Sequence, residues 1–382
     1  MSAQSIVIAG YARSPFHPAH KGALVKVRAE DLAAQVIKGL VARTKVPVDD
    51  IEDLIVGNAF PEGEQGLNVA RLIGFLADLP QKIGAVTVNR FCGSSMQAIH
   101  QAAGAIQLGA GEVFMCAGVE SMSRVPMMGF NPMPHPELYK RMPQVFMGMG
   151  DTAENVASKY QITRKEQEDF AVTSHAKAAR AQDTGSFRDE VVPITDPKGS
   201  VIDADGCIRS GTTAATLSDL KPAFVADGTV TAGTSSPLTD GASAVLVCTE
   251  DYAMKKGLTP IARLKSIAVS GCAPEIMGIG PVGATRKALD RASLTVKDLN
   301  VIELNEAFAS QSLACIRDLG LNHDTINKDG GAIALGHPLG ATGARIIGKA
   351  ASLLKRDGGK YALATQCIGG GQGIATILET VS

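Results

Sequence analysis

The strongest constraint on the fold of this chain is a thirteen-residue stretch that occurs twice. Residues 48–60 align without a gap with residues 296–308, an offset of 248 positions (296 minus 48), and a valine, an aspartate, an alanine and a phenylalanine are identical in both copies. Each copy follows a helix-like stretch and is followed by a Val-Asn or Ile-Asn step, a helix of small residues and an apolar strand. Chance similarity is the alternative, but a duplicated unit explains these features together.

Short apolar runs mark the strands of this unit. Each run is bounded by glycine or polar residues and alternates with helical patterns, which is typical of buried strands in α/β proteins. The runs are residues 6–8, 54–56, 113–116, 244–248 and 361–365. With 382 residues, 45% hydrophobic and 20% charged, the chain can bury the core of two domains or one large pseudo-symmetric unit. We therefore predict an ordered α/β protein.

Charge and cysteine usage narrow the class of protein further. The 37 basic and 38 acidic residues give a net charge of -1, so no basic field would attract nucleic acid. No apolar run approaches the ~20 residues of a membrane-spanning helix, and no basic segment precedes the first apolar stretch. The seven cysteines form no CxxC pair, and neither a metal-ligand spacing nor a P-loop is present. We expect a cytoplasmic protein without a membrane span, a metal or a nucleic-acid partner.

The composition changes between the two copies of the repeat, over residues 121–238. Seven of the twelve methionines fall between positions 122 and 149, among five prolines, and a charged amphipathic helix is predicted over residues 163–175. This segment is predicted to be an insert that lies over the paired core. Its methionines either fill irregular gaps or form an adaptable wall for a flexible apolar ligand chain.

A cysteine is placed where a helix could activate it. Cys92 stands directly before Gly-Ser-Ser and a helix of small apolar residues, so the helix is expected to be buried with its N-terminus pointing inward. The free N–H groups and the positive dipole end of that helix would favour a thiolate. The alternative is a buried structural cysteine without chemistry.

Two further residues have the surroundings of a reactive group. His337 lies in a glycine-dense turn stiffened by Pro338, where the backbone permits the close approach of a partner. Cys367 follows a buried strand and enters a glycine-rich loop, the place where sites of α/β proteins form. Residues 278–283 match G-x-G-x-x-G, but Pro281 interrupts the turn and no strand ends directly before it, so nicotinamide binding is not expected. The remaining cysteines are predicted to be core residues: Cys116, Cys207, Cys248, Cys272 and Cys315.

Four motifs together resemble the active-site motifs of the thiolases. They are Cys92-Gly-Ser-Ser, Asn305-Glu-Ala-Phe-Ala309, Gly336-His-Pro-Leu-Gly340 and Cys367-Ile-Gly-Gly-Gly371, and the resemblance runs essentially from end to end. It implies the thiolase fold, a five-layered α-β-α-β-α arrangement of two duplicated halves with an inserted loop domain. The halves would be residues 1–120, continued by 239–262, and residues 263–382. The inserted CoA-binding loop domain would be residues 121–238.

The resemblance also implies a role for each motif. Cys92 would be the nucleophile that carries the acyl group, His337 would activate it, and Cys367 would move a proton at the carbon α to the thioester. His337 and a water on Asn305 would hold the enolate oxygen, whereas the N–H groups of Cys92 and Gly369 would hold the acyl-enzyme oxyanion. Transfer through a covalent intermediate implies ping-pong kinetics.

Coenzyme A would be a co-substrate, with no tightly bound cofactor. In the family the insert binds CoA, so Ser236 would contact the pantetheine arm, Lys221 would lie near the nucleotide, and Met149 and Phe308 would border the acyl pocket. Three positions depart from the common pattern of the family: Lys221 stands where arginine is frequent, Asp329 where asparagine is frequent, and Gln366 where an apolar residue is common. These departures concern CoA affinity and the tuning of Cys367.

The predicted function is degradative cleavage of 3-ketoacyl-CoA by CoA, yielding acetyl-CoA and a shortened acyl-CoA. The alternative is an acetoacetyl-CoA-specific acetyltransferase that works in the condensing direction. Thiolases of that kind often carry histidine before the Met-Gly of the insert, where Gly148 stands here. The run from Cys367 to Gly369 argues against a decarboxylating ketoacyl synthase, and the presence of all four motifs argues against a non-catalytic binding subunit. The resemblance further implies a homodimer or homotetramer and a β-oxidation multienzyme partner.

Overall fold

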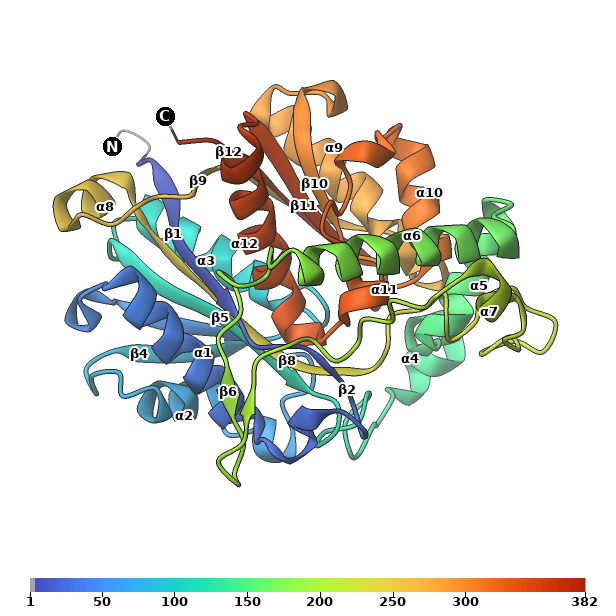
Figure 1. Ribbon diagram of the computed structural model, residues 1–382, viewed down its shortest axis with the longest axis horizontal. Helices are drawn as coiled ribbons and strands as arrows, with labels where there is room; N and C mark the ends of the chain where they lie inside the picture. Colours follow the sequence, from blue (N-terminus) through green and yellow to red (C-terminus); the bar gives the residue numbers. More distant parts are fainter. Residues whose placement is uncertain (1–3, 382) are drawn as a thin grey trace.

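The computed structural model describes residues 4–381, and all of its strands except a two-stranded ribbon form one mixed sheet that runs through both halves of the chain (Figure 1). The first half contributes β1 (Ile6–Arg13), β3 (Asp53–Gly57), β4 (Gly84–Val88), β5 (Val113–Ser121) and β8 (Thr239–Thr249). The second half contributes β9 (Ala262–Gly271), β10 (Leu299–Leu304), β11 (Tyr361–Ile368) and β12 (Gln372–Glu379). The strand order is β10-β11-β12-β9-β1-β8-β5-β3-β4. Because β1 and β9 pair through only Val7 and Ile8, the two halves of the sheet meet at one corner.

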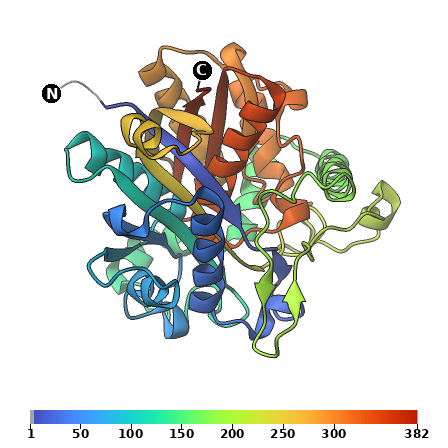
Figure 2. The same ribbon diagram turned by 60° about the vertical axis from the view of Figure 1, so that its left-hand side comes forward.

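Helices make the layers around and between the two halves. Two helices, α3 (Ser94–Gln107) and α12 (Leu339–Asp357), pack against each other, and α12 contacts strands of both halves. Outside the first half lie α1 (Ala29–Thr44) and α2 (Val69–Leu76), and outside the second half lie α9 (Gly280–Ala292) and α10 (Ala309–Leu319). Figure 2 shows the same ribbon turned by 60° about the vertical axis. The five-layered α-β-α-β-α fold predicted for this chain is confirmed.

The duplication is visible in the pairing register. In the first half Asp53 of β3 lies opposite Phe114 of β5, and in the second half Val301 of β10 lies opposite Ala362 of β11. Both partners are displaced by the same 248 positions (301 minus 53 and 362 minus 114) that relate the two copies of the repeat. The repeat therefore codes for one parallel strand pair built twice, and chance similarity is excluded.

Close contact in the central layer depends on glycine. A Cβ atom at Gly343 of α12 would lie 2.2 Å from the backbone nitrogen of Met96 in α3, and one at Gly118 of β5 would lie 2.1 Å from the carbonyl oxygen of Gly340. A side chain at Gly343 would push the two helices apart, and one at Gly118 would push them away from β5, because a well-packed interior cannot absorb the extra atoms. As a result the N-termini of α3 and α12 converge at the same end of the central layer.

The insert connects β5 to β8. It contains α4 (Pro136–Arg141), α5 (Met149–Lys159), α6 (Arg164–Asp183), α7 (Ala214–Ser218) and a ribbon of β6 (Ile194–Thr195) and β7 (Val201–Ile202). The charged helix predicted over 163–175 is confirmed as the start of α6, where Thr163 and Glu166 form a capping box. The limits of the three predicted domains stay a prediction.

Buried ion pairs attach the insert to the core. Arg13 of β1 is fully buried and pairs with Glu190 at 2.7 Å and with both carboxylate oxygens of Asp205 at 2.7 and 2.8 Å. Lys349 of α12 reaches the same Glu190 at 3.0 Å and Asp329 at 2.7 Å. Truncating one member would leave a buried charge without its partner, which is strongly destabilising.

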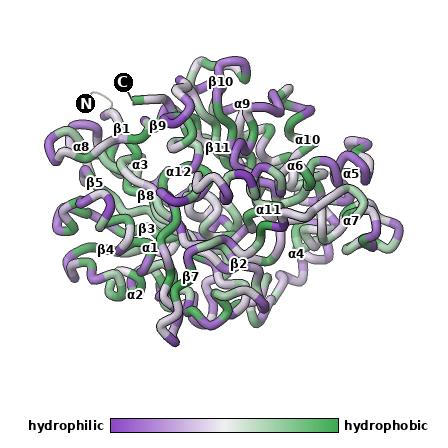
Figure 3. The backbone as a smooth tube through the Cα atoms, in the orientation of Figure 1, coloured by the Kyte–Doolittle hydropathy of each residue, from purple (hydrophilic) through white to green (hydrophobic). Residues whose placement is uncertain are grey.

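The remaining elements join the layers. They are β2 (His17–Pro18), α8 (Glu250–Lys256) and α11 (Ala332–Leu335). Figure 3 shows hydrophobic residues along β10 and β11 and hydrophilic residues at the outlying turns. Over the described residues, no helix has the length and hydropathy needed to cross a membrane. Four of the five cysteines predicted as core residues are buried, but Cys272 is only partly buried because it lies in the loop after β9, so that part of the prediction is wrong.

Candidate active site

A cavity of about 640 Å³ lies where the insert covers the N-termini of α3 and α12. Its wall contains seven of the nine residues predicted for the site: Cys92, His337, Cys367, Gly369, Ser236, Met149 and Phe308. Asn305 is fully buried directly behind His337, with its Nδ2 atom 3.3 Å from Nε2 of the imidazole. Lys221 is exposed and does not line the cavity. The fold thus brings together residues that are up to 277 positions apart (369 minus 92).

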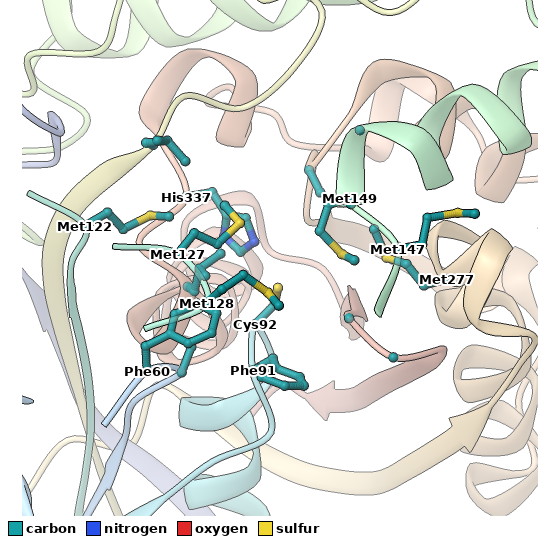
Figure 4. Close-up of a pocket in the computed structure, with 18 of the residues that line it drawn as sticks. Phe60, Phe91, Cys92, Met122, Met127, Met128, Met147, Met149, Met277 and His337 are labelled. Carbon is teal, nitrogen blue, oxygen red and sulfur yellow. The ribbon is translucent and has the colours of Figure 1, made fainter. Parts of the chain in front are cut away.

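The backbone around Cys92 is a tight turn between β4 and α3. Phe91 has a φ of 42°, an uncommon conformation for a residue with a side chain. The turn is closed by the Gly93 N–H, which donates to the Arg90 carbonyl at 2.9 Å, and by the Ser94 N–H, which donates to the Phe91 carbonyl at 3.1 Å. This geometry presents the Cys92 thiol to the cavity (Figure 4).

Burial governs the ionisation of Cys92. It raises the pKa of the thiol to about 11, although hydrogen bonds from the N–H groups of Gly369 and of Cys92 itself oppose the rise. The charge of Glu120 raises this pKa further. The expectation that the helix N-terminus would make Cys92 a thiolate is therefore wrong for the protein alone, because desolvation outweighs the backbone dipoles. The two N–H groups nevertheless point at the sulfur, so they could also bind the oxygen of an acyl group attached to that sulfur.

The imidazole of His337 is held in one tautomer. Its Nδ1 atom lies 2.6 Å from the Thr342 hydroxyl, which donates its own proton to the Pro338 carbonyl at 2.9 Å and so must accept from Nδ1–H. The Nε2 atom therefore carries the lone pair, and it accepts the hydrogen bond from Asn305. Burial, with a smaller contribution from Arg345, lowers the pKa of His337 to about 3, so the ring is neutral. A neutral imidazole whose Nε2 atom is unprotonated is suited to accept a proton.

Cys367 is the last but one residue of β11 and faces the same cavity. Burial raises the pKa of its thiol well above the ordinary value, and the neighbouring Cys92 raises it further. The strand is followed by three glycines, of which Gly370 and Gly371 have φ values of 79° and 83°. These left-handed residues turn the chain into β12 and place the Gly369 N–H at Cys92.

The methionines of the insert line the cavity. Of the seven between positions 122 and 149, only Met142 is absent from its wall. Figure 4 shows Met122, Met127 and Met128 on one side of Cys92 and Met147 and Met149 on the other. The methionines therefore form a wall around the thiol, and the gap-filling alternative does not describe them.

Three residues that the sequence analysis did not assign to the site support it. Thr342 sets the tautomer of His337, as described above. Glu120 is fully buried and accepts hydrogen bonds from the N–H groups of Ala59 at 2.8 Å and Gly340 at 2.9 Å, which joins the end of β3 to the start of α12. Gln366 donates to the Cys92 carbonyl. An isolated glutamate in the apolar strand β5 was the one signal that could have indicated Glu120.

The ionisation of Cys92 can be checked by alkylation. With a pKa of about 11, the thiolate fraction increases about tenfold per pH unit between pH 7 and 9, because only the thiolate reacts. We expect the rate of iodoacetamide labelling at Cys92, followed by mass spectrometry of its peptide, to rise accordingly. A rate that levels off below pH 8 would show instead that the thiol is activated in the free protein.

Two thiols, a neutral imidazole and two N–H donors around one apolar cavity can support covalent acyl transfer combined with proton transfer at carbon. Within residues 4–381 no group of three or more histidine, cysteine, aspartate or glutamate side chains is arranged to hold a metal ion.

Comparison with known proteins agrees with this geometry. The family models for the N-terminal and C-terminal domains of thiolase match residues 6–251 and 258–380. The 3-ketoacyl-CoA thiolases of Bacillus subtilis and Vibrio cholerae are 46% and 50% identical to this chain, and each alignment covers 98% of this chain and 99% of the relative.

Two crystal structures are closely similar as well. Human mitochondrial 3-ketoacyl-CoA thiolase in complex with CoA superposes with a TM-score of 0.91 at 39% identity, covering 99% of this chain and 98% of that one. Bacillus anthracis acetyl-CoA acetyltransferase superposes with a TM-score of 0.92 at 38% identity, covering 99% of both chains. By sequence over its whole length, by fold and by the residues gathered at its cavity, this chain belongs to the thiolase family.

Proposed function

We propose that the protein is a degradative 3-ketoacyl-CoA thiolase, which uses CoA to cleave 3-ketoacyl-CoA into acetyl-CoA and an acyl-CoA shortened by two carbons. The observation that carries this proposal is the meeting of Cys92, Cys367 and the lone pair of His337 at one apolar cavity. Cleavage of a carbon–carbon bond next to a ketone requires a nucleophile for the carbonyl and a separate acid for the departing carbon. The two thiols can supply these two functions.

In the first half-reaction the sulfur of Cys92 adds to the ketone carbon while Nε2 of His337 takes its proton. The bond between the α-carbon and the ketone carbon then breaks, the acyl group stays on Cys92 as a thioester, and Cys367 gives its proton to the departing acetyl-CoA carbanion. In the second half-reaction CoA gives its thiol proton to the Cys367 thiolate and attacks the thioester. Cys92 leaves and recovers its proton from His337, so both thiols return to their initial state.

Charge on the reacting oxygens would be stabilised at two places. The N–H groups of Cys92 and Gly369, which already contact the sulfur, are in position for the oxyanion formed when the Cys92 thioester is made or broken. We assign the enolate oxygen of acetyl-CoA to His337, once it is protonated, and to a water held by Asn305, whose Nδ2 atom lies 3.3 Å from Nε2 of the imidazole. A donor lost from such a site typically costs about 10²–10³-fold in rate.

Coenzyme A would enter past the insert. Ser236 lies at the cavity with its hydroxyl 3.1 Å from the Ala307 carbonyl, and Phe308 packs edge to face against Phe224 with ring centroids 5.9 Å apart. We assign Ser236 to the pantetheine arm, and Met149 and Phe308 to the border of the acyl pocket. The exposed Lys221 would meet the nucleotide outside the cavity. A related human enzyme has been crystallised with CoA, which supports CoA as the co-substrate.

The wall of the cavity favours chains longer than four carbons. Met127 and Met128 are 37% and 49% exposed, so the methionine-lined side of the cavity opens to solvent instead of closing behind the thiol. Unbranched methionine side chains adapt to apolar chains of different lengths. The relatives named 3-ketoacyl-CoA thiolase support 3-ketoacyl-CoA as the substrate class. The alternative is acetoacetyl-CoA-specific acetyl transfer in the condensing direction, and the similar Bacillus anthracis protein is named an acetyl-CoA acetyltransferase.

A chain-length series tests the proposal. The purified protein is incubated with CoA and 3-ketoacyl-CoA substrates of four to sixteen carbons, and loss of the ketoacyl absorbance is followed, with Cys92→Ser as the control. We expect kcat/KM to peak at medium or long chains. Cleavage confined to four carbons would support the acetyltransferase alternative, and no cleavage at any length would contradict the thiolase proposal.

We also propose that the protein works in the cytoplasm as a homodimer or homotetramer, alongside a partner of fatty-acid β-oxidation. The cysteine usage of the chain and the generally oligomeric state of thiolases support this assignment. Light scattering of the purified protein would measure the subunit number. A monomeric mass at micromolar concentration would contradict the oligomeric part of the proposal.

A further inference from the structure

The turn that carries Cys92 belongs to the first half of the chain but rests on a hairpin of the second half, formed by β11 and β12. A Cβ atom at Gly93 would lie 2.6 Å from Cδ1 of Ile368 and 3.2 Å from Cγ2 of Ile374, so the turn is in direct contact with both strands. At the edge of this contact Nη1 of Arg90 donates to Gln372 at 2.8 Å. The same hairpin carries Cys367.

One polar side chain connects the Cys92 turn to the hairpin of β11 and β12 inside this contact. Gln366 is fully buried on β11, next to Cys367, and its Nε2 donates to the carbonyl of Cys92. The carbonyl can only accept, so the amide group of Gln366 must face it with its NH₂ end. Among residues 4–381, no backbone N–H group from a turn or loop donates to this carbonyl, and Gln366 is the side chain that does.

The oxygen of the same Gln366 amide group makes this arrangement energetically costly. The Oε1 atom of Gln366 is buried and has no hydrogen-bond partner among the described residues. A buried polar atom without a partner is destabilising, and each such group in a folded protein calls for an explanation. A methionine or leucine at this position would avoid the penalty, so stability alone does not explain the glutamine.

We propose that Gln366 is a positioning residue for the thiolase reaction. By holding the Cys92 carbonyl, it fixes the peptide between Cys92 and Gly93 and keeps the Cys92 thiol and N–H at a constant distance from Cys367. Gln366 touches no reacting atom and acts through the backbone of the nucleophile. The proposal rests on the proposed function, because two thiols need a fixed separation only if both act on one substrate.

The test compares two matched substitutions, Gln366→Met and Gln167→Met. Gln167 is also a fully buried glutamine with one donated hydrogen bond, to Thr229 at 2.9 Å, and with an unpartnered Oε1, but it lies on α6 of the insert. Both substitutions keep the side-chain volume and remove the donor. Any effect of losing a buried amide as such is therefore common to the two variants.

Four measurements are made for wild type and both variants. They are the melting temperature, the fraction of Cys92 that iodoacetamide can label, the kcat of unlabelled protein divided by that fraction together with KM, and hydrogen exchange of the peptide that contains the Cys92 turn. We expect Gln366→Met to lower kcat about tenfold with KM for CoA within twofold, and to speed exchange in the turn. Gln167→Met should leave both kcat and exchange in the turn within twofold of wild type.

The outcomes separate this inference from the function on which it rests. Wild type that cleaves no 3-ketoacyl-CoA contradicts the proposed function, and the exchange measurement still tests the positioning role. If wild type is active but Gln366→Met keeps kcat per labelled site within twofold, or leaves exchange in the turn unchanged, the positioning role is wrong. An equal loss of kcat in Gln167→Met would also overturn it, because the effect would then be one of general stability.

Discussion

Replacing Cys92 by serine is expected to lower the rate of 3-ketoacyl-CoA cleavage by at least about 10⁴-fold, the scale of effect seen when a covalent nucleophile is removed. A serine hydroxyl is far less acidic than a thiol, so the neutral His337, whose pKa burial lowers to about 3, takes its proton much less readily. The side chain keeps nearly the same shape, so CoA binding should stay within a few fold. Steady-state thiolysis and calorimetric titration with CoA measure the two quantities.

A second observation checks the covalent step directly. Wild type mixed with a 3-ketoacyl-CoA in the absence of CoA should gain the mass of one acyl group on the peptide that contains Cys92, and Cys92→Ser should gain none. Cleavage by the serine variant at more than a hundredth of the wild-type rate would assign the nucleophile to another residue. An acyl group found on Cys367 would have the same consequence.

Replacing Cys367 by alanine is expected to lower thiolysis about 10³-fold, within the range that a positioned acid or base contributes. The loss should be unequal for two partial reactions. Exchange of the α-protons of acetyl-CoA with solvent depends on a base at carbon and should fall the most. Transfer of an acetyl group between acetyl-CoA and labelled CoA should fall less, since a thiol of pKa ~8.5 ionises far more readily than a C–H bond. Proton exchange is followed by NMR and transfer by the label.

The neighbouring Cys272 provides the control for this variant. It lies in the loop after β9, partly buried and outside the wall of the cavity, so Cys272→Ala should retain both partial reactions. Iodoacetamide should still label Cys92 in Cys367→Ala, which would show that the nucleophile is intact. If α-proton exchange survived in Cys367→Ala at more than a tenth of the wild-type rate, another group would be the acid and base at carbon.

Much of the site could be predicted because its residues lie at positions that local sequence makes recognisable. Cys92, His337 and Cys367 each stand beside glycines at a junction between a strand or turn and a buried element, and such junctions are visible without knowledge of the fold. The repeat was equally local, since each copy spans one short helical turn and one strand. The structure places these predicted residues at one cavity, with Asn305 directly behind its wall.

Other features could not be read in this way because they depend on burial and on long-range contacts. The sign of the pKa shift at Cys92 was predicted wrongly, since the helix dipole is a local feature whereas desolvation is set by everything packed around the thiol. The position of Lys221 outside the cavity and the partial exposure of Cys272 likewise depend on how loops are folded over the core.

The amino-acid sequence by itself determined the α/β class, the duplication, the family resemblance and most of the candidate residues that the structure gathers at one cavity, because periodicity, glycine placement and short motifs are properties of neighbouring residues. Only the tertiary structure decided which ring nitrogen of His337 carries the proton and how the methionines surround Cys92. It also decided that Gln366 reaches the Cys92 carbonyl across 274 positions of sequence. The physical reason is that hydrogen-bond direction and desolvation are set by groups that meet only when the two halves of the chain pack together.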